Sequence, residues 1–333
     1  MVIPTHNRRE LLIQAVASVR SQTMRNLEIV VVDDGSTDDT TSALSSISDV
    51  RLSVIHLSEA RGVSHARNRG IRAATGQWIS FLDDDDLWSP EKLARQLQAA
   101  RETGRCWACS GSVTVDAALR VIAGSPPPAP DVIADTLPIR NCVPAGASNV
   151  VVARQLLNAA GEFDERLRHL ADWDLWIRLA SRDLPAVVPF PDVAYRLHGS
   201  NASDDAEAID GELNLIAERH ASARDGREID RAFVLRWAAW NLLRVGRRGA
   251  AARMYAKAAA QGDPASAARA FAAVLDPSIV QRRLGRALDH EFAHPTSDWL
   301  ADFRRKTNEI STSLHEPAAT QFMESRSAPT IAE

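Results

Sequence analysis

The first 115 residues alternate short apolar runs, rich in β-branched side chains, with longer amphipathic stretches, and this alternation most constrains the fold. Strands that alternate with helices usually pair in parallel, so the pattern predicts an α/β protein with a mostly parallel sheet flanked by helices. The strands expected here are Met1–Pro4, Leu27–Val32, Arg51–Leu57, Trp78–Leu82 and Cys106–Val115. The helices expected between them are Arg9–Ser21, Thr37–Ser46, Val63–Ala74 and Pro90–Glu102.

The first expected strand is short, because Met1–Ile3 leads directly into Pro4, which has no N–H to give to a strand ladder. For this reason we expect either that the natural chain starts upstream of Met1 or that its N-terminus has been trimmed. A missing half-strand would destabilise the sheet but leave the following loop intact.

Beyond residue 115 the chain is expected to become less regular and then helical. Residues 124–146 read as a loop, with Pro126–Pro130 as an extended segment. The elements expected next are a strand at Ala147–Ala153, a helix from Gln155, a helix around Asp172–Leu179, and strands at Ala186–Pro189 and Val193–His198. We therefore expect an α/β domain over residues 1–204, a helical region over 205–290 and a poorly ordered tail over 291–333.

Composition is that of an ordinary soluble protein, with 45% hydrophobic and 25% charged residues, and the net charge of −4 argues against nucleic-acid binding. Between Arg219 and Lys257, ten Lys and Arg stand against three Asp and Glu, which suits either an anionic surface or a solvated helix face. Three cysteines form neither a disulfide framework nor a zinc ribbon, which indicates a reducing cytosol. No apolar run approaches the roughly 20 residues that span a bilayer, so we expect a cytoplasmic protein, with peripheral contact at the inner face of a membrane as a further option.

Four consecutive aspartates, Asp83 to Asp86, directly follow an apolar run. Adjacent carboxylates repel each other, so a fold that holds them together needs counter-charge, most simply a divalent cation. Residues two apart in an extended chain point the same way, so Asp83 and Asp85 are predicted to face one Mg²⁺ or Mn²⁺ ion. The alternative is a solvated turn before the helix that Ser89 and Pro90 begin. An EF-hand is excluded, because Trp88 stands where its turn glycine belongs.

Three expected strands end in polar residues, namely Pro4–Asn7, Asp33–Ser36 and the aspartate run. Each has a simpler alternative as a turn or helix cap, but ligands of open α/β sheets bind beyond the carboxyl ends of the strands. Together they predict a polar ligand rich in hydrogen-bond donors, such as a nucleoside. Arg67 is positioned in its expected helix so that its guanidinium, which suits phosphate, would face the same edge of the sheet. The chain has neither a P-loop nor the glycine motif of dinucleotide-binding proteins.

Several motifs, in order and suitably spaced, resemble family 2 glycosyltransferases of the GT-A fold over about residues 1–200. In the first half they are Pro4–Asn7, Val31–Asp38, Ala66–Gly70 and Phe81–Asp86. Later in the chain they are Gly161–Asp164, Asp172–Trp176 and Tyr195–His198.

The resemblance implies that Asp83 and Asp85 hold Mg²⁺ or Mn²⁺ against the diphosphate of a nucleotide sugar, with His198 either a further metal ligand or a structural histidine. It implies that Asp172 is the catalytic base, although the glutamate that usually precedes this aspartate is replaced by Ala171. The residues expected to bind the nucleotide sugar are Pro4, Thr5, Asn7, Asp33, Asp34, Arg67, Asp83 and Asp84. Trp173 is expected in an acceptor wall or the core, and Trp176 in the core.

The implied reaction is a single displacement with inversion, in which Asp172 takes the proton of an acceptor hydroxyl. The acceptor is expected to be a glycan or a lipid-linked sugar in surface polysaccharide or glycoconjugate biosynthesis. Two rival functions are a nucleotidyltransferase, whose glycine-rich N-terminal loop is absent, and a catalytically silent sugar-nucleotide-binding or scaffold protein that uses the helical region. That region resembles one tetratricopeptide-like hairpin, and since about three repeats are normally needed to bury a core, we expect it to dock on the α/β domain or to contact another copy or a membrane.

Overall fold

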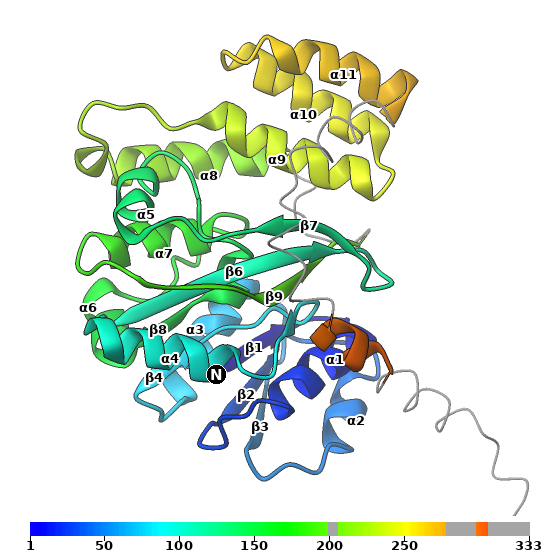
Figure 1. Cartoon of the computed structure of the whole chain (residues 1–333). Helices are drawn as coiled ribbons and strands as arrows, with labels where there is room; N and C mark the ends of the chain where they lie inside the picture. The colour runs from blue at the N-terminus through cyan, green and yellow to red at the C-terminus, as the bar shows by residue number, and fades with distance from the viewer. Residues whose placement is uncertain (199–205, 278–297, 306–333) are drawn as a thin grey trace, which may run out of the picture.

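The computed structural model describes residues 1–198, 206–277 and 298–305, and shows an α/β part with a layer of helices above it (Figure 1). A three-stranded parallel sheet has the order β1 (Val2–Thr5), β2 (Ile29–Asp33) and β3 (Leu52–His56). Strands β1 and β2 are buried along their whole length, as is usual for parallel strands covered on both faces. A parallel bridge between Val2 and Phe81 links this sheet to the segment that carries the aspartates. The predicted α/β class is therefore confirmed.

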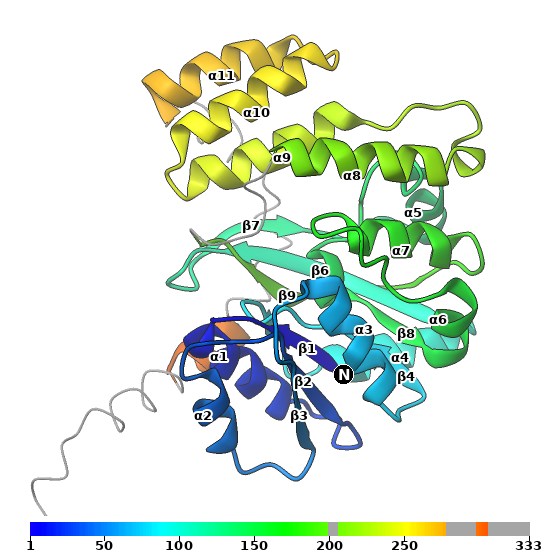
Figure 2. The same ribbon diagram turned by 180° about the vertical axis from the view of Figure 1, so that it is seen from behind.

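The larger sheet is mixed and has the order β4, β8, β6, β9, β5, with β7 paired to β6. Its strands are β4 (Trp78–Ser80), β5 (Leu87–Trp88), β6 (Trp107–Val115), β7 (Val121–Ser125), β8 (Val151–Ala153) and β9 (Ala186–Arg196). Side chains alternate along β6, so that Trp107 and Cys109 join the core beneath α7 (Ala171–Ala180), while Ala108 packs with Leu97 of α4 (Lys92–Thr103). Figure 2, seen from behind, shows α7 and α3 (Val63–Ala73) on the face opposite α4.

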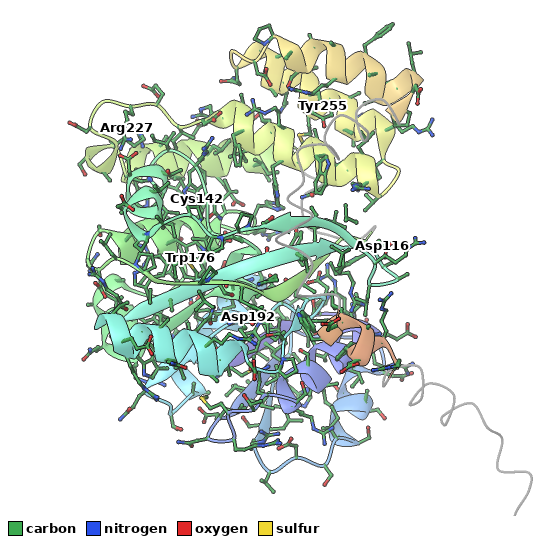
Figure 3. All side chains as sticks on the ribbon, viewed as in Figure 1. Asp116, Cys142, Trp176, Asp192, Arg227 and Tyr255 are labelled. Atoms are coloured by element: carbon green, nitrogen blue, oxygen red, sulfur yellow. The ribbon has the colours of Figure 1, made fainter. Side chains whose placement is uncertain are left out.

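The remaining helices of the α/β part are α1 (Arg9–Arg20), α2 (Thr40–Ser45), α5 (Pro130–Thr136) and α6 (Arg154–Ala160). In α1 the buried residues include Leu12, Ala15, Val16 and Val19, whose spacing of three or four lays one apolar face on the parallel sheet. Trp176 is fully buried and stacks on Trp107, with ring centroids 6.3 Å apart. Figure 3 labels Trp176 within the α/β part. The prediction that Trp176 belongs to the core is thus confirmed.

Several expectations about secondary structure are wrong. The strand expected at Ala147–Ala153 is only Val151–Ala153, because a 3-10 helix over Gly146–Asn149 precedes it. Residues 124–146 are not a continuous loop, because the end of β7 and all of α5 fall within them. The two strands expected near residues 186 and 193 form the single strand β9, and register shifts around Gly111 of β6 absorb the proline-containing stretch that separates them. The aspartate run is not extended, because the Asp86 N–H donates to the Asp83 carbonyl at 3.2 Å and closes a turn.

The C-terminal helices are α8 (Ala206–Arg219), α9 (Arg231–Arg244), α10 (Arg248–Ala260) and α11 (Ala265–Leu275). Buried residues of α8 to α11, such as Leu213 and Leu242, belong to the same apolar cluster as Trp173 and Trp176, so these helices dock on the α/β part. The expected boundary after residue 204 lies outside the described residues. None of the helices in the described part combines the length and apolar character that crossing a bilayer requires.

Residues 298–305 are helical, which differs from the poorly ordered tail expected over 291–333. Leu300 is 1% exposed and packs in a cluster with Leu87, Val113 and Ala194, while Trp299 and Phe303 cover the cluster from outside. The other residues of the expected tail lie outside the described ranges.

Candidate active site

A cavity of about 620 Å³ extends from the carboxyl ends of β1 and β2 to helix α9. Eight of the predicted site residues line it: Pro4, Thr5, Asp34, Arg67, Asp83, Asp84, Asp85 and Asp172. Asn7, Asp33 and His198 are described by the structure but do not belong to the lining. The predicted meeting of polar strand ends therefore occurs, and Asp172, in the first turn of α7, joins them from far along the chain.

The aspartate turn places three carboxylates, those of Asp83, Asp84 and Asp85, at the cavity. The turn explains why Asp84 joins its neighbours there, whereas an extended chain would have pointed it to the other face. Asp86 is fully buried instead, and accepts hydrogen bonds from Ser148 Oγ at 2.6 Å and the Arg196 N–H at 2.9 Å. Its carboxylate therefore fixes the turn to the surrounding structure.

Arg8 is a site residue that the sequence reasoning missed. Its Nη1 donates to Asp84 Oδ1 at 3.0 Å and to Asp85 Oδ2 at 2.8 Å, and Thr5 Oγ1 donates to Asp84 Oδ2 at 2.7 Å. Burial, together with the charge of Asp85, still raises the pKa of Asp84, so one guanidinium does not fully compensate the turn. The only signal in the sequence is a cation directly after the polar end of β1, about 75 residues before its partners.

Two further groups contact the turn. Arg67, on α3, forms an ion pair with Asp83, and its guanidinium lies 5.2 Å from the ring centroid of Phe163. His198, just after β9, has Nε2 2.9 Å from Asp85 Oδ2. The structure thus brings the predicted histidine to the predicted carboxylate, while its role stays a prediction.

The polar residues that follow β1 and end β2 divide into two groups. Asp34 lines the cavity, and its two carboxylate oxygens accept from the N–H groups of Arg61 at 2.9 Å and Gly62 at 2.7 Å, just before α3. Asp33 accepts from the Ser36 N–H at 2.9 Å, and Asn7 Oδ1 accepts from the Thr37 N–H at 2.7 Å. Asp33 and Asn7 therefore shape the loop, and Asp34 faces the space that the loop encloses.

Asp172 lies in the first turn of α7 and lines the cavity. Burial raises its pKa to about 6, against the positive charge of Arg67, so this carboxyl exchanges a proton near neutral pH. Its Oδ2 is 3.4 Å from Asn141 Nδ2, and a Cβ atom at position 146 would lie 2.6 Å from the same oxygen. Gly146, with a φ of +50°, is thus the residue that lets the neighbouring loop close over this carboxylate. Trp173 is fully buried, and its Nε1 donates to the Leu137 carbonyl at 2.6 Å.

Helix α8 holds the start of α7. The Glu212 carboxylate accepts from the backbone N–H groups of Arg168 at 2.9 Å, His169 at 2.9 Å and Leu170 at 2.9 Å. At the next turn Asp174 Oδ1 pairs with Arg219 and with His220, which lie at and after the end of α8. Sequence reasoning could not find these contacts, because about forty residues separate the partners.

The aspartate turn fits a hard divalent cation in the kind of atom it offers, because its three carboxylates at the cavity supply oxygen ligands, and Arg8 and Arg67 pair with them in this structure. No group of three or more His, Cys, Asp or Glu side chains in the described part is arranged as a complete metal cage. Mg²⁺ and its relatives commonly use only one or two carboxylates, and take further ligands from substrate phosphates and water.

Comparisons of the sequence and of the structure show which known proteins this chain resembles. A family model described as "Glycosyl transferase family 2" matches residues 1–123. Two proteins of Escherichia coli, WfgD and WfaP, are each named UDP-Glc:alpha-D-GlcNAc-diphosphoundecaprenol beta-1,3-glucosyltransferase. WfgD is 30% identical over 179 residues, which are 54% of this chain and 68% of WfgD. WfaP is 27% identical over 206 residues, which are 61% of this chain and 78% of WfaP.

Among solved structures, the mannosyltransferase PcManGT from Pyrobaculum calidifontis, in complex with GDP-Man and Mn²⁺, has a similar fold, with a TM-score of 0.51 and 22% identity. The alignment covers 92% of this chain and 85% of PcManGT.

Proposed function

Since this chain belongs to glycosyl transferase family 2, we propose that its cavity binds a nucleoside-diphosphate sugar and a divalent cation and transfers the sugar with inversion to an acceptor hydroxyl. The chain is a nucleotide-sugar-dependent glycosyltransferase of the GT-A fold. One observation carries the proposal beyond the family: the aspartate turn, Arg67 and Asp172 line a single cavity, although they come from distant parts of the chain.

The donor would lie along the carboxyl ends of β1 and β2. Pro4, Thr5 and Asp34 form the wall for the nucleoside, where a carboxylate suits ribose hydroxyls and the N–H of a base. Asn7 and Asp33 would contribute through the loop that they shape. The diphosphate would approach Arg67, whose guanidinium matches phosphate oxygens and keeps its charge.

Asp83 and Asp85 would hold the cation, with Asp84 close to the donor and His198 as a further ligand or as the residue that orients Asp85. When bound, the cation would supply positive charge at the departing diphosphate. Mg²⁺ and Mn²⁺ both suit carboxylate oxygens, and the complex of PcManGT with Mn²⁺ supports the choice.

Asp172 would act as the base. It accepts the proton of the acceptor hydroxyl while that oxygen forms a bond to the anomeric carbon from the face opposite the diphosphate. The bond between the anomeric carbon and the diphosphate oxygen breaks, and its electron pair leaves with the diphosphate, beside Arg67. One displacement inverts the anomeric centre.

The acceptor would be a glycan or a lipid-linked sugar of surface polysaccharide or glycoconjugate biosynthesis, by analogy with the names of WfgD and WfaP. The protein would then work at the inner face of the membrane, and the basic stretch from Arg219 to Lys257 would favour contact with anionic lipid. A catalytically silent binding protein is less well supported, because it would not need a buried carboxylate with a pKa near neutral at the cavity.

The test uses the Asp172→Asn variant beside Asp131→Asn, an exposed aspartate of α5, as the control. At least one of UDP, GDP and dTDP, with Mn²⁺ or Mg²⁺, should raise the melting temperature of wild type and both variants, and only Asp172→Asn should lose transfer. NMR of the product should show the anomeric configuration opposite to that of the donor. Retained configuration would rule out the single displacement, and the absence of any nucleotide-dependent shift would rule out the donor site.

A further inference from the structure

The end of the cavity away from the aspartate turn is formed by one face of helix α9. Its lining residues lie on successive turns of the helix: Phe233, Val234, Trp237, Trp240 and Asn241. Other residues of the helix, such as Leu235, Ala238 and Leu242, are buried in the apolar core. One side of helix α9 therefore packs in the apolar core, and another side lines the cavity.

Asn241 is an unusual residue for this position. It is 2% exposed, and within the described residues neither its side-chain nitrogen nor its side-chain oxygen has a hydrogen-bond partner. Buried amides are almost always hydrogen-bonded, because burying them without a partner costs stability. Since Asn241 also lines the cavity, the missing partner is best supplied by a ligand that both donates and accepts.

Two tryptophans, Trp237 and Trp240, precede this amide in the helix by four residues and by one, and line the same cavity. Trp237 is 40% exposed, which is high for so large an apolar side chain. The guanidinium of Arg244 lies 5.2 Å from the ring centroid of Trp240 and holds that ring in place. Aromatic surface next to a single amide suits a sugar ring, which presents apolar C–H groups on its faces and hydroxyls at its edge. An isoprenoid chain would use the rings but leave both polar atoms of Asn241 unpaired.

Helix α9 is also tied to the loop that contacts Asp172. The Asp230 N–H donates to the Ile139 carbonyl at 3.0 Å, and the Arg140 guanidinium lies 5.0 Å from the ring centroid of Phe233. The next residue, Asn141, reaches the Asp172 carboxylate. A sugar held by α9 would therefore sit at the cavity end that leads to the base.

We propose that Trp237, Trp240 and Asn241 form the binding site for the sugar ring of the acceptor. The ring lies against the two indoles, its hydroxyls pair with the Asn241 amide, and its nucleophilic hydroxyl points to Asp172. This inference rests on the proposed function, since it assigns the acceptor half of the same cavity. The helical region would then recognise the acceptor, and would not bind peptides as an array of tetratricopeptide repeats does.

The first experiment compares Asn241→Leu and Trp237→Ala with Phe271→Ala, which removes an aromatic ring that is 70% exposed on α11 and outside the cavity lining. Saturation-transfer NMR would be recorded with methyl glycosides of N-acetylglucosamine, glucose and galactose, with UDP and Mn²⁺ present. Wild type and Phe271→Ala should bind at least one glycoside. Asn241→Leu and Trp237→Ala should each weaken that binding about tenfold, the usual effect of losing paired polar groups or ring contact.

Asn241→Leu has a second signature, because leucine removes an unpaired amide from the interior. Its melting temperature should equal or exceed that of wild type, so weaker binding could not be ascribed to unfolding. The inference is overturned if the glycosides bind all variants equally, if no glycoside binds wild type, or if farnesyl phosphate binds at this end and the glycosides do not. The nucleotide-dependent shift in melting temperature, measured with UDP, GDP and dTDP, separates the two claims. A shift with any of them, without an effect of the variants on glycoside binding, would refute only the acceptor site. No shift with any of them would refute the proposed function.

Discussion

Replacing Glu212 by alanine should both destabilise the protein and slow sugar transfer, because one carboxylate on α8 holds the turn from which the Asp172 helix begins. Glu212 is 7% exposed and accepts three backbone N–H groups, at 2.9 Å from Arg168, 2.9 Å from His169 and 2.9 Å from Leu170. These donors belong to the start of a helix, where no intrahelical acceptor is available to them.

The magnitude follows from the number and kind of these bonds. A hydrogen bond to a charged group contributes about 1.5–3 kcal/mol, and the three bonds to one carboxylate are not additive. Arg168 and His169 border the cavity, so water can replace part of what alanine removes. We therefore expect Glu212→Ala to lower the free energy of unfolding by about 3–5 kcal/mol, and Glu212→Gln, which keeps one oxygen acceptor, by about 1–2 kcal/mol.

Urea unfolding of the two variants would be compared with that of Glu218→Ala, which removes an exposed glutamate from the same helix. Glu218→Ala should lie within about 0.5 kcal/mol of wild type. In Glu212→Gln, kcat should fall while the UDP-dependent shift in melting temperature stays the same, because the base moves and the donor site does not. A Glu212→Ala protein as stable as the control would refute the structural argument, and an unchanged kcat in Glu212→Gln would refute its link to Asp172.

Two further predictions concern Asp172 and Leu300. Because the pKa of Asp172 is raised to about 6, kcat/KM should rise with pH through that value and level off above it, and a flat profile from roughly pH 5 to pH 8 would contradict its role as the base. The folded protein also binds this proton more tightly than the unfolded chain, so the contribution of this group to stability should fall as the pH rises from its ordinary value of 3.8 to about 6. Leu300→Ala should lower the free energy of unfolding by about 2–4 kcal/mol in thermal or urea unfolding, since Leu300 is 1% exposed, and no loss would mean that residues 298–305 do not pack as described.

The strands and helices of the first half were predictable from sequence, because each is a run whose period matches its structure. Strands β1 and β2 fall within about two residues of the expected bounds, as buried apolar runs should. The same reasoning failed where local signals were ambiguous. Glycine and serine at the end of β7 and the prolines after it suggested a loop, yet Pro130 begins α5, where a missing N–H costs little.

Half of the candidate site was predictable for a different reason. The carboxyl ends of parallel strands meet at one edge, so Asp34 and the aspartate turn had to approach each other once the sheet was right. Arg8, Glu212 and Asn241 were not predictable, because nothing near them in the sequence encodes their partners. A lone arginine, a helical glutamate and a helical asparagine normally belong to a solvated surface.

These long-range contacts bear on how the chain divides into domains. Helix α8 holds the start of α7 through Glu212, and α9 forms the far end of the cavity through Asn241. Leu213 and Leu242 share one apolar cluster with Trp173, so a chain cut after residue 204 would lose packing against the helix that carries Asp172. We therefore propose that the boundary expected there separates kinds of secondary structure and not units that fold alone. The helical region then belongs to the enzyme in the same sense as the sheet, because both supply residues that line the cavity.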